Sequence, residues 1–196
     1  MHFIVLFGPP AVGKMTVGDE ITRLTGIPVF HNHLSIEPVL RFFPFGHPAF
    51  GRIVDEFRRH VLAEVAASDL PGAVFTFVWA LDAEEDTRFV DELCKPFAEV
   101  GAKIALVELK ADLEQRLIRN RTEKRLEAKP SKRNLEGSEK NLLDVEQRYR
   151  MNSDGGIPLP YRHVVIDNTE RSAVDVAGQI VEMLAIPRAN PDDVNV

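Results

Sequence analysis

An apolar strand that runs into a glycine-bounded loop and then into a helix is the feature that most constrains the fold. The strand candidate is residues 3–7, and the apolar positions Val17, Ile21 and Leu24 follow at helical spacing. Between them the loop reads Gly8-Pro9-Pro10-Ala11-Val12-Gly13-Lys14-Met15-Thr16. In a strand–loop–helix context, the spacing Gly-x-x-x-x-Gly-Lys predicts a cradle for the phosphates of a nucleotide, formed by the whole loop.

The residue types in this loop suit the binding of an anion. Backbone N–H groups can turn inward around phosphate, and the following helix adds the positive end of its dipole. Gly8 and Gly13 permit backbone angles and a close approach that a side chain would obstruct. Lys14 supplies a cation for the terminal phosphates and is therefore a catalytic candidate. The alternative is a glycine loop that merely joins strand to helix.

One position in the loop departs from the usual motif. The residue after the lysine is normally Ser or Thr, whose hydroxyl binds Mg²⁺, but Met15 stands there and Thr16 follows. The sequence GKMT resembles the GKGT of adenylate-kinase-like enzymes. That resemblance implies Mg²⁺ held largely through waters and an acidic side chain, with Thr16 and Asp82 as candidates, and argues against a GTPase-type switch. Asp82 could instead cap the helix predicted to begin at Ala83.

Bulk properties predict one domain over residues 1–186 with a polar tail over 187–196. The chain has 196 residues, 44% hydrophobic and 28% charged, which suits one well-buried core. A net charge of −6 argues against a nucleic-acid-coating protein. The single Cys94 excludes an intrachain disulfide, and we find neither a membrane-spanning run nor a signal peptide. We therefore expect a cytoplasmic protein.

Short apolar runs alternate with amphipathic stretches along the chain, as in βαβ units. The predicted strands are 3–7, 27–31, 73–79, 103–109 and 163–167. Beyond the helix after the loop, the predicted helices are 34–42, 50–68, 83–100, 112–127, 138–150 and 170–185. This pattern predicts an α/β fold, a doubly wound five-stranded parallel sheet with helices on both faces. Ligands of such sheets bind beyond the carboxyl ends of the strands.

Two histidines stand at the predicted end of the second strand. The stretch Val29-Phe30-His31-Asn32-His33-Leu34-Ser35-Ile36-Glu37 resembles the part of shikimate kinase in which two aspartates face the acceptor and the metal. His31 and His33 occupy those positions, so the resemblance implies contact with an acceptor, with His31 as a catalytic candidate. An imidazole can accept a hydroxyl proton. Metal ligation, or hydrogen bonds to nearby backbone alone, are the alternatives.

Further acceptor-site candidates come from the same resemblance. Residues 50–55 are similar to the Glu-Phe-Arg-Arg-Ile-Glu segment of shikimate kinase, with Gly51 at the arginine that grips the acceptor carboxylate and Arg52 at the second arginine. The glycine-rich loop after the third strand is replaced by residues 77–82, which include Trp79. Arg52 and Trp79 are the candidates for binding substrate, although Trp79 could simply fill the core. These departures argue against shikimate itself as the substrate.

A basic stretch follows the fourth strand, and helical spacing brings Arg116 near Arg119 and Arg121 near Arg125. In small P-loop kinases a similar helix leads into a mobile lid, here about 119–137. The resemblance implies that Arg116 packs on adenine and that Arg119, Arg121 or Arg125 reaches the transferring phosphate. Guanidinium groups fork onto phosphate oxygens and stack on rings. A solvated charged helix face is the alternative.

The last candidate segment is the end of the fifth predicted strand. In the same kinases this turn contacts the adenine ring, so Asn168 and Thr169 are nucleotide-site candidates. Helix capping explains Thr169 equally well.

Nearly the full length of the chain resembles the small P-loop kinases grouped with shikimate kinase, gluconate kinase, adenylate kinase and chloramphenicol phosphotransferase. The resemblance implies a P-loop NTPase fold of the nucleoside-monophosphate-kinase type, with ATP and Mg²⁺ as cofactors. It also implies phosphoryl transfer to a small-molecule acceptor by a monomer or homodimer. Two alternatives stay open: an ATP-binding regulator or weak ATPase without an acceptor, and an RNA-end kinase.

Overall fold

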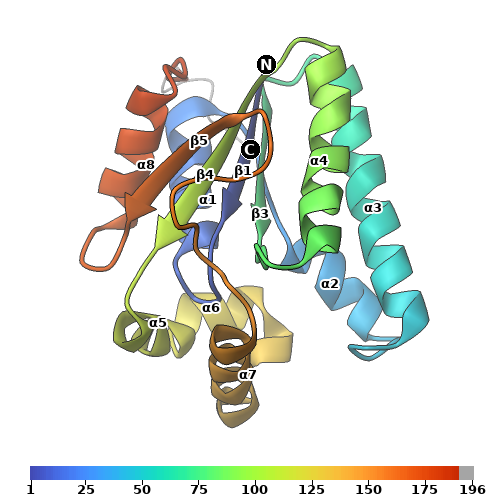
Figure 1. The fold of residues 1–196 in the computed structure, drawn as a ribbon, viewed down its shortest axis with the longest axis vertical. Helices are drawn as coiled ribbons and strands as arrows, with labels where there is room; N and C mark the ends of the chain where they lie inside the picture. Colours follow the sequence, from blue (N-terminus) through green and yellow to red (C-terminus); the bar gives the residue numbers. More distant parts are fainter. Residues whose placement is uncertain (190–196) are drawn as a thin grey trace.

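A parallel sheet forms the centre of the molecule in the computed structural model, which describes residues 1–189 (Figure 1). Its strands have the spatial order β2-β3-β1-β4-β5, and all four neighbouring pairs are parallel. They are β1 (His2–Phe7), β2 (Val29–His31), β3 (Gly72–Phe77), β4 (Lys103–Lys110) and β5 (Arg162–Asp167). The predicted five-stranded parallel sheet is confirmed. Its order reverses at β1, which places a ligand crevice at the carboxyl end of that strand.

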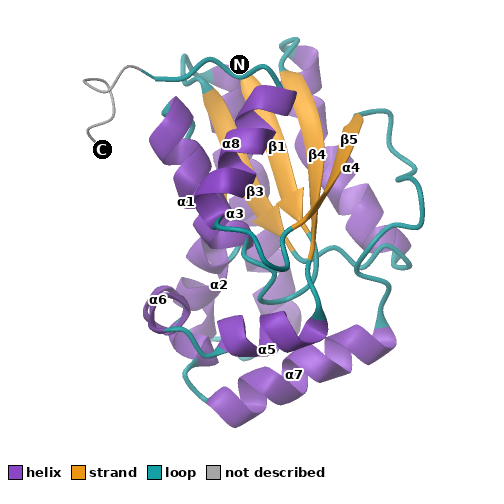
Figure 2. Ribbon diagram, turned by 90° about the vertical axis from the view of Figure 1, so that its left-hand side faces the viewer, coloured by secondary structure: helices purple, strands orange, loops and turns teal. Residues whose placement is uncertain are grey.

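Helices cover both faces of this sheet. On one face lie α1 (Lys14–Thr25) and α8 (Ala173–Met183), and on the other lie α3 (Pro48–Ala67) and α4 (Glu84–Glu99) (Figure 1). The remaining helical elements lie beyond the carboxyl edge of the strands (Figure 2). They are α2 (His33–Leu40), α5 (Leu113–Asn120), α6 (Glu123–Ala128), the 3₁₀ turn η1 (Pro130–Lys132) and α7 (Leu135–Arg148).

The core consists of two layers, because successive residues of a strand point to opposite faces. In β1, Ile4 and Leu6 pack with the α1 and α8 residues, whereas Phe3, Val5 and Phe7 pack with those of α3 and α4. The second layer is rich in aromatic rings. With all five of these side chains at most 1% exposed, β1 is buried on both faces, as its unbroken apolar sequence requires.

The predicted helix over 112–127 is wrong, because the chain breaks between α5 and α6. Thr122 has an extended backbone with ψ of 141°, and its hydroxyl donates a hydrogen bond to the carbonyl of Arg119 at 3.0 Å. The fully buried side chain of Asn120 ties the break together, since its Oδ1 accepts from Arg125 at 3.1 Å and from Ser138 at 3.0 Å. This break turns α6 back over the sheet edge.

Two further boundaries differ from the prediction. Helix α7 begins at Leu135, three residues early, because the Asn134 side chain accepts from the Gly137 N–H and caps it. Helix α8 begins at Ala173, since Ser172 is the residue that caps it. Thr169 therefore does not cap that helix, and its hydroxyl accepts instead from the backbone N–H of Asp112 at 3.2 Å.

Of the predicted tail over 187–196, residues 190–196 lie outside the described residues. Ala189, the last described one, donates its backbone N–H to the carbonyl of Leu24 at 3.1 Å. None of the helices within residues 1–189 combines the length and apolar character that crossing a membrane would need.

Candidate functional site

The loop between β1 and α1 has the geometry of a cradle. Gly8 has φ of 138° and Gly13 has φ of 109°, in the left-handed region that favours glycine. A Cβ on Gly8 would collide with the carbonyl oxygen of Leu109, and one on Gly13 would lie 2.7 Å from Nδ2 of Asn168. Both glycines are therefore needed for the loop to approach its neighbours so closely.

Lys14 begins α1 and is only 8% exposed. Its ammonium donates hydrogen bonds to the carbonyls of Gly8 at 2.6 Å and Pro9 at 2.8 Å, so it lies inside the curve of the loop. Burial, followed by the charges of Lys129 and Arg125, holds the pKa of Lys14 well below its usual value. An anion beside Lys14 would restore that pKa, so the lysine is placed to attract one.

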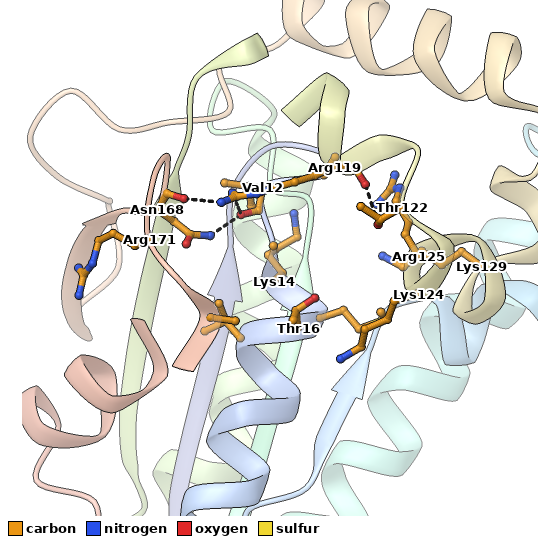
Figure 3. Close-up of a pocket in the computed structure, with 15 residues that line it drawn as sticks. Val12, Lys14, Thr16, Arg119, Thr122, Lys124, Arg125, Lys129, Asn168 and Arg171 are labelled. Atoms are coloured by element: carbon orange, nitrogen blue, oxygen red, sulfur yellow. Dashed lines mark hydrogen bonds between the residues drawn. The ribbon is translucent and has the colours of Figure 1, made fainter. Parts of the chain in front are cut away.

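A cavity of about 360 Å³ opens over this loop; we call it the phosphate-loop cavity (Figure 3). It is lined by residues 11–17, by parts of α5, α6 and the segment after β5, and by Lys129. Its lining contains no acidic side chain and six cationic ones: Lys14, Arg119, Lys124, Arg125, Lys129 and Arg171. Such a lining is suited to a multiply charged anion.

One wall of the phosphate-loop cavity is fixed to the loop by Arg119 and Asn168 (Figure 3). Asn168 Nδ2 donates to the Val12 carbonyl at 2.6 Å, and Arg119 donates to the same carbonyl at 3.2 Å. Arg119 also donates to the carbonyls of Asn168 at 2.7 Å and Thr169 at 3.1 Å. The buried Oδ1 of Asn168 has no hydrogen-bond partner among the described residues, which leaves an acceptor for a ligand. Sequence reasoning named both side chains.

Two other predicted arginines lie elsewhere. Arg116 is 2% exposed, and its guanidinium pairs with Glu146 of α7 at 2.7 Å. Arg121 is exposed and pairs with Glu139 of α7 at 2.7 Å. Neither lines the phosphate-loop cavity. Arg116 therefore fastens α7 to α5, and the cavity-lining guanidiniums of this stretch are those of Arg119 and Arg125.

The two predicted histidines flank the start of α2. His33 donates from Nδ1 to Glu37 at 2.8 Å, and burial followed by the charges of Lys129 and Lys132 lowers its pKa to about 2. Burial and the charge of Lys129 also lower the pKa of His31, against an opposing effect of Asp19. The Nδ1 of His31 is buried without a hydrogen-bond partner within residues 1–189. Both imidazoles are therefore neutral near pH 7, and His31 has a free ring nitrogen.

A second cavity of about 360 Å³, the α2–α3 cavity, begins at Asn32, between the two histidines. Its lining is apolar apart from Asn32, one guanidinium and three carboxylates: Arg58, Asp55, Glu85 and Asp86. Arg58 is 5% exposed and donates to the hydroxyl of Ser35 at 2.9 Å and, at 3.4 Å, to Asp55. Burial lowers the pKa of Arg58 to about 10 and raises those of Asp55 and Asp86.

Three of the other predicted residues, Arg52, Trp79 and Asp82, lie outside both cavities. Arg52 is exposed on α3, one residue beyond Gly51, which does line the α2–α3 cavity. Trp79 is fully buried, and its indole N–H donates to the hydroxyl of Thr87 at 3.1 Å. It therefore fills the core and does not line the α2–α3 cavity. Asp82 accepts from the backbone N–H of Arg150 at 3.1 Å and does not face the phosphate loop.

The residues present fit phosphate better than they fit a bare metal ion. The glycine cradle and the cationic lining match a polyphosphate. No group of three or more histidine, cysteine or acidic side chains able to hold a metal occurs among residues 1–189. Thr16 is the predicted metal residue that lines the phosphate-loop cavity. A magnesium ion there would thus be held mainly by phosphate oxygens and water.

Sequence reasoning did not single out Arg58, and it gave no separate role to Lys129 within the basic stretch. Arg58 stands four residues after Val54 and four before Leu62, so the helical period of α3 places it on the buried face. An arginine within an apolar stripe was the available signal. Lys129 follows α6 in a charged stretch, where nothing in the sequence distinguishes it from its basic neighbours.

Several solved structures of small-molecule kinases share this architecture. The chain is similar to a sugar kinase from a Janibacter species, with a TM-score of 0.64, 13% identity, and 100% of this chain and 99% of that chain covered. It is also similar to a gluconokinase from Sinorhizobium meliloti, with a TM-score of 0.59 and 17% identity, and 94% of this chain and 91% of that chain are covered. A third similar structure is a shikimate kinase from Acinetobacter baumannii, solved with shikimate. Its TM-score is 0.53 and its identity 18%, and 100% of this chain and 96% of that chain are covered. The chain therefore has the P-loop kinase-like fold. No protein-family model and no curated protein sequence matches it.

Proposed function

We propose that this chain transfers the terminal phosphoryl group of ATP to a small-molecule acceptor. One observation carries the proposal: two cavities of different character lie at the carboxyl edge of the sheet, and the second begins at Asn32, beside a His31 that feels the charge of the cavity-lining Lys129. The charged side chains that line the phosphate-loop cavity are all cationic, whereas the α2–α3 cavity is mainly apolar with more carboxylates than cations. Such an arrangement would hold a donor and an acceptor on either side of one reacting centre.

The phosphate loop and its surroundings would bind the donor. Backbone N–H groups of residues 11–16 and the ammonium of Lys14 would receive the triphosphate, and Arg125 would add a further positive charge. The free Oδ1 of Asn168 and the guanidinium of Arg119 would meet the base. When bound, ATP supplies the phosphoryl group, and Mg²⁺ neutralises charge on its oxygens beside Thr16.

His31 would receive the acceptor's proton. Its imidazole is neutral near pH 7, and its buried Nδ1 has no partner among the described residues. As an acceptor hydroxyl oxygen bonds to phosphorus and the bond from phosphorus to the ADP oxygen breaks, the hydroxyl proton would pass to His31. A strong base is not needed, since the transition state of phosphoryl transfer is loose.

The α2–α3 cavity limits the chemistry of the acceptor. Three carboxylates oppose one guanidinium, which Ser35 and Asp55 already contact. A ligand with several negative charges would be repelled there, whereas hydroxyl or amino groups could donate to the carboxylates. We therefore propose a neutral or amino-bearing acceptor with hydroxyl groups and an apolar face. This cavity also favours a transferase over an ATPase that lacks an acceptor.

Residues 122–134, which we call the cover segment, carry α6 and η1 over the phosphate-loop cavity. We propose that this segment acts as the lid of the site. Its closure would exclude water, so that the acceptor and not water receives the phosphoryl group.

The test is acceptor-dependent release of ADP across a panel of polyols, sugars and amino sugars, with acidic analogues of each. We expect at least one neutral or amino-bearing compound to accelerate ADP release. His31→Ala should then lower that acceptor-dependent rate by about 10²-fold while leaving ATP affinity unchanged. His60→Ala, an exposed histidine of α3, is the matched control. Equal rates in wild type and His31→Ala would remove His31 from the mechanism.

A further inference from the structure

The cover segment is fastened to α2 by a single carboxylate. Glu37 accepts from the Ser131 hydroxyl at 2.6 Å through one oxygen and from the Ser131 backbone N–H at 3.2 Å through the other. The first oxygen also accepts from His33 at 2.8 Å. A second contact lies beside it, where the ammonium of Lys132 is 5.9 Å from the centre of the Phe45 ring. Helix α2, which contributes to the proposed acceptor cavity, is therefore bonded directly to η1.

Lys129 stands two residues before Ser131 and lines the phosphate-loop cavity together with Lys14. The other cations of the cover segment have partners: Lys124 pairs with Asp19 at 2.7 Å, and the side chains of Arg125, Lys132 and Arg133 each donate to an oxygen. Among residues 1–189, the ammonium of Lys129 has no hydrogen-bond or ion-pair partner, although its backbone carbonyl accepts from the Lys132 N–H at 2.8 Å. It is therefore a half-buried cation without an anion of its own.

The charges around Lys129 are mostly of its own sign. The cations are Lys14 of α1, Arg125 of α6 and Lys132 of η1, and the carboxylates are Asp19 of α1 and Glu37 of α2. His31 of β2 and His33 of α2 also face Lys129, but their imidazoles are neutral near pH 7. Burial, followed by Arg125 and Lys132, lowers the pKa of Lys129 to about 7 against the opposing charges of Glu37 and Asp19. Lys129 in turn is the largest charge acting on Lys14, His31 and His33, which places it at the centre of the cationic cluster.

We propose that Lys129 contacts the terminal phosphate of the bound nucleotide and that Glu37 is a positioning residue that holds it there through Ser131. This inference rests on the proposed ATP site and names a contact within it. Because Glu37 belongs to α2, the same helix that adjoins the acceptor cavity would set the position of a phosphate-binding lysine. Loss of Glu37 would then weaken phosphate binding from the acceptor side.

The first experiment is isothermal titration of ATP into the full chain at about pH 8, in two buffers of different ionisation enthalpy. Phosphate favours the charged ammonium, so wild type should take up a proton when ATP binds. Lys129→Met should weaken ATP binding about tenfold, as for a charge-assisted hydrogen bond, and reduce that uptake to the part that Lys14 supplies. Lys129→Arg should reduce the uptake equally but keep the affinity, because arginine is always protonated.

Lys140→Met removes one exposed lysine of α7 and is the control for net charge. It should keep both affinity and proton uptake. ATP's own protonation is common to all variants and cancels in the comparison. Wild-type affinity in Lys129→Met, or wild-type uptake in Lys129→Arg, would overturn the contact. Loss of all ATP binding in Lys14→Ala, beside an unaffected Lys129→Met, would leave the proposed function standing and reject only this inference.

A double-mutant cycle tests the role of Glu37. Glu37→Ala should weaken ATP binding about fivefold in the wild-type background, less than removal of Lys129 itself, and less than about twofold in the Lys129→Met background. Ser131→Ala, which keeps the backbone hydrogen bond and does not disturb α2, should give a smaller loss in the same direction. Equal losses from Glu37→Ala in both backgrounds would show that Glu37 does not act through Lys129 and would overturn the positioning role.

Discussion

Glu108 and Lys14 are both nearly inaccessible charged residues near the carboxyl ends of neighbouring central strands, yet their surroundings differ. Glu108 of β4 is fully buried and meets hydrogen-bond donors on every side. Lys14 is 8% exposed and lies in a cluster of other cations, with only backbone carbonyls as partners. The comparison separates charge that is satisfied within the protein from charge that a ligand must satisfy.

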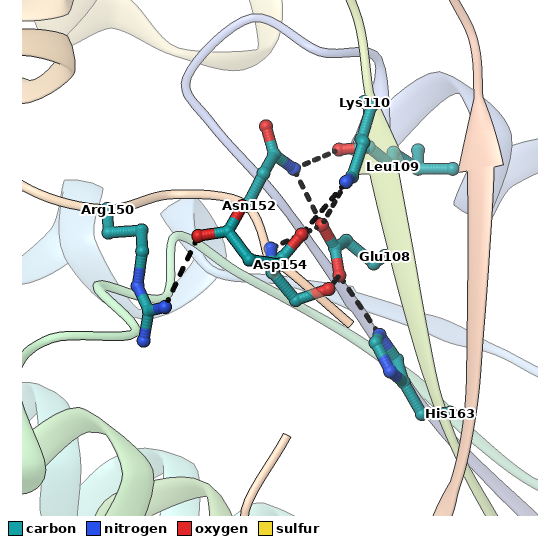
Figure 4. Close-up of polar contacts among 8 residues, drawn as sticks. Glu108, Leu109, Lys110, Arg150, Asn152, Asp154 and His163 are labelled. Atoms are coloured by element: carbon teal, nitrogen blue, oxygen red, sulfur yellow. Dashed lines mark hydrogen bonds and ion pairs between the residues drawn. The ribbon is translucent and has the colours of Figure 1, made fainter. Parts of the chain in front are cut away.

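The donors around Glu108 tie the segment after α7 to the sheet (Figure 4). Ser153 donates its hydroxyl at 2.6 Å and its backbone N–H at 2.8 Å, and Asn152 and His163 each contribute a contact at 3.0 Å. Lys110 lies 3.7 Å away. Burial alone would raise the pKa of Glu108, but the bonds from Ser153 and Asn152 hold it below the ordinary value. This cluster stabilises the fold.

The cations over the phosphate loop have the opposite signature. Burial and mutual repulsion lower the pKa values of Lys14 and Lys129, and burial lowers that of Arg125. Gathering like charges in a half-enclosed cavity is unfavourable for folding, so the cluster does not stabilise the protein. It is explained by an anionic ligand. Removal of a residue should therefore affect ligand binding in one cluster and stability in the other.

The largest effect should come from Lys14→Ala. Because Lys14 is the cation inside the loop, its loss should lower ATP-dependent turnover by about 10²-fold to 10³-fold. Thermal stability should stay the same or rise, because a buried like charge is removed. Turnover and the melting temperature of the same sample check both expectations. Unchanged turnover and ATP affinity would show that the phosphate loop is not the ATP site.

Glu108→Gln should reverse this pattern. One neutral amide cannot accept all the donors that face the carboxylate, so the free energy of unfolding should fall by about 3 kcal/mol while ATP affinity is kept. Urea unfolding and nucleotide titration measure the two quantities. Asp154→Asn is the control, since that carboxylate is exposed and lies 3.6 Å from Arg150. A stable Glu108→Gln with weakened ATP binding would break the comparison.

The same variant should change the pH dependence of stability. The pKa of Glu108 is lower in the folded protein than the ordinary value of 4.5, so its contribution is fully present above that pH. It is lost as the pH falls through the lower, folded-state pKa. The acid-side loss of stability should therefore be shallower in Glu108→Gln than in wild type.

Much of the fold follows from local sequence. The apolar runs of β1, β3 and β4 indicate buried parallel strands, and the spacing from Gly8 to Lys14 predicts the loop between β1 and α1. The break between α5 and α6 does not follow, because it depends on the buried side chain of Asn120 and its partner Ser138 in a later helix. Helical periodicity continues through that break, so the pattern alone predicts one helix.

The candidate site divides in the same way. Residues near the loop motif, such as Lys14 and Thr16, are fixed by the motif itself. Residues whose placement depends on a distant partner cannot be assigned from the motif. Arg116 forms an ion pair with Glu146, and Glu37 accepts a hydrogen bond from Ser131, 94 residues later in the sequence. Resemblance to a kinase helix assigned Arg116 to the base, because sequence alone cannot show which cations already have a protein partner.

Substitution of Arg121 should have the smallest effect on stability and turnover, because this arginine belongs to neither the Glu108 cluster nor the Lys14 cluster. It belongs to the same basic stretch as Arg119, but its exposed guanidinium pairs with the partly exposed Glu139 and lies in neither cluster. Arg121→Gln should change the free energy of unfolding by less than about 0.5 kcal/mol and leave turnover unchanged, since surface ion pairs contribute little. Arg119→Gln, the matched substitution, removes the contacts to the carbonyls of Val12 and Asn168 and should weaken ATP binding. Equal losses of turnover in the two variants would mean that Arg121 reaches the phosphates after all, by a movement of the cover segment.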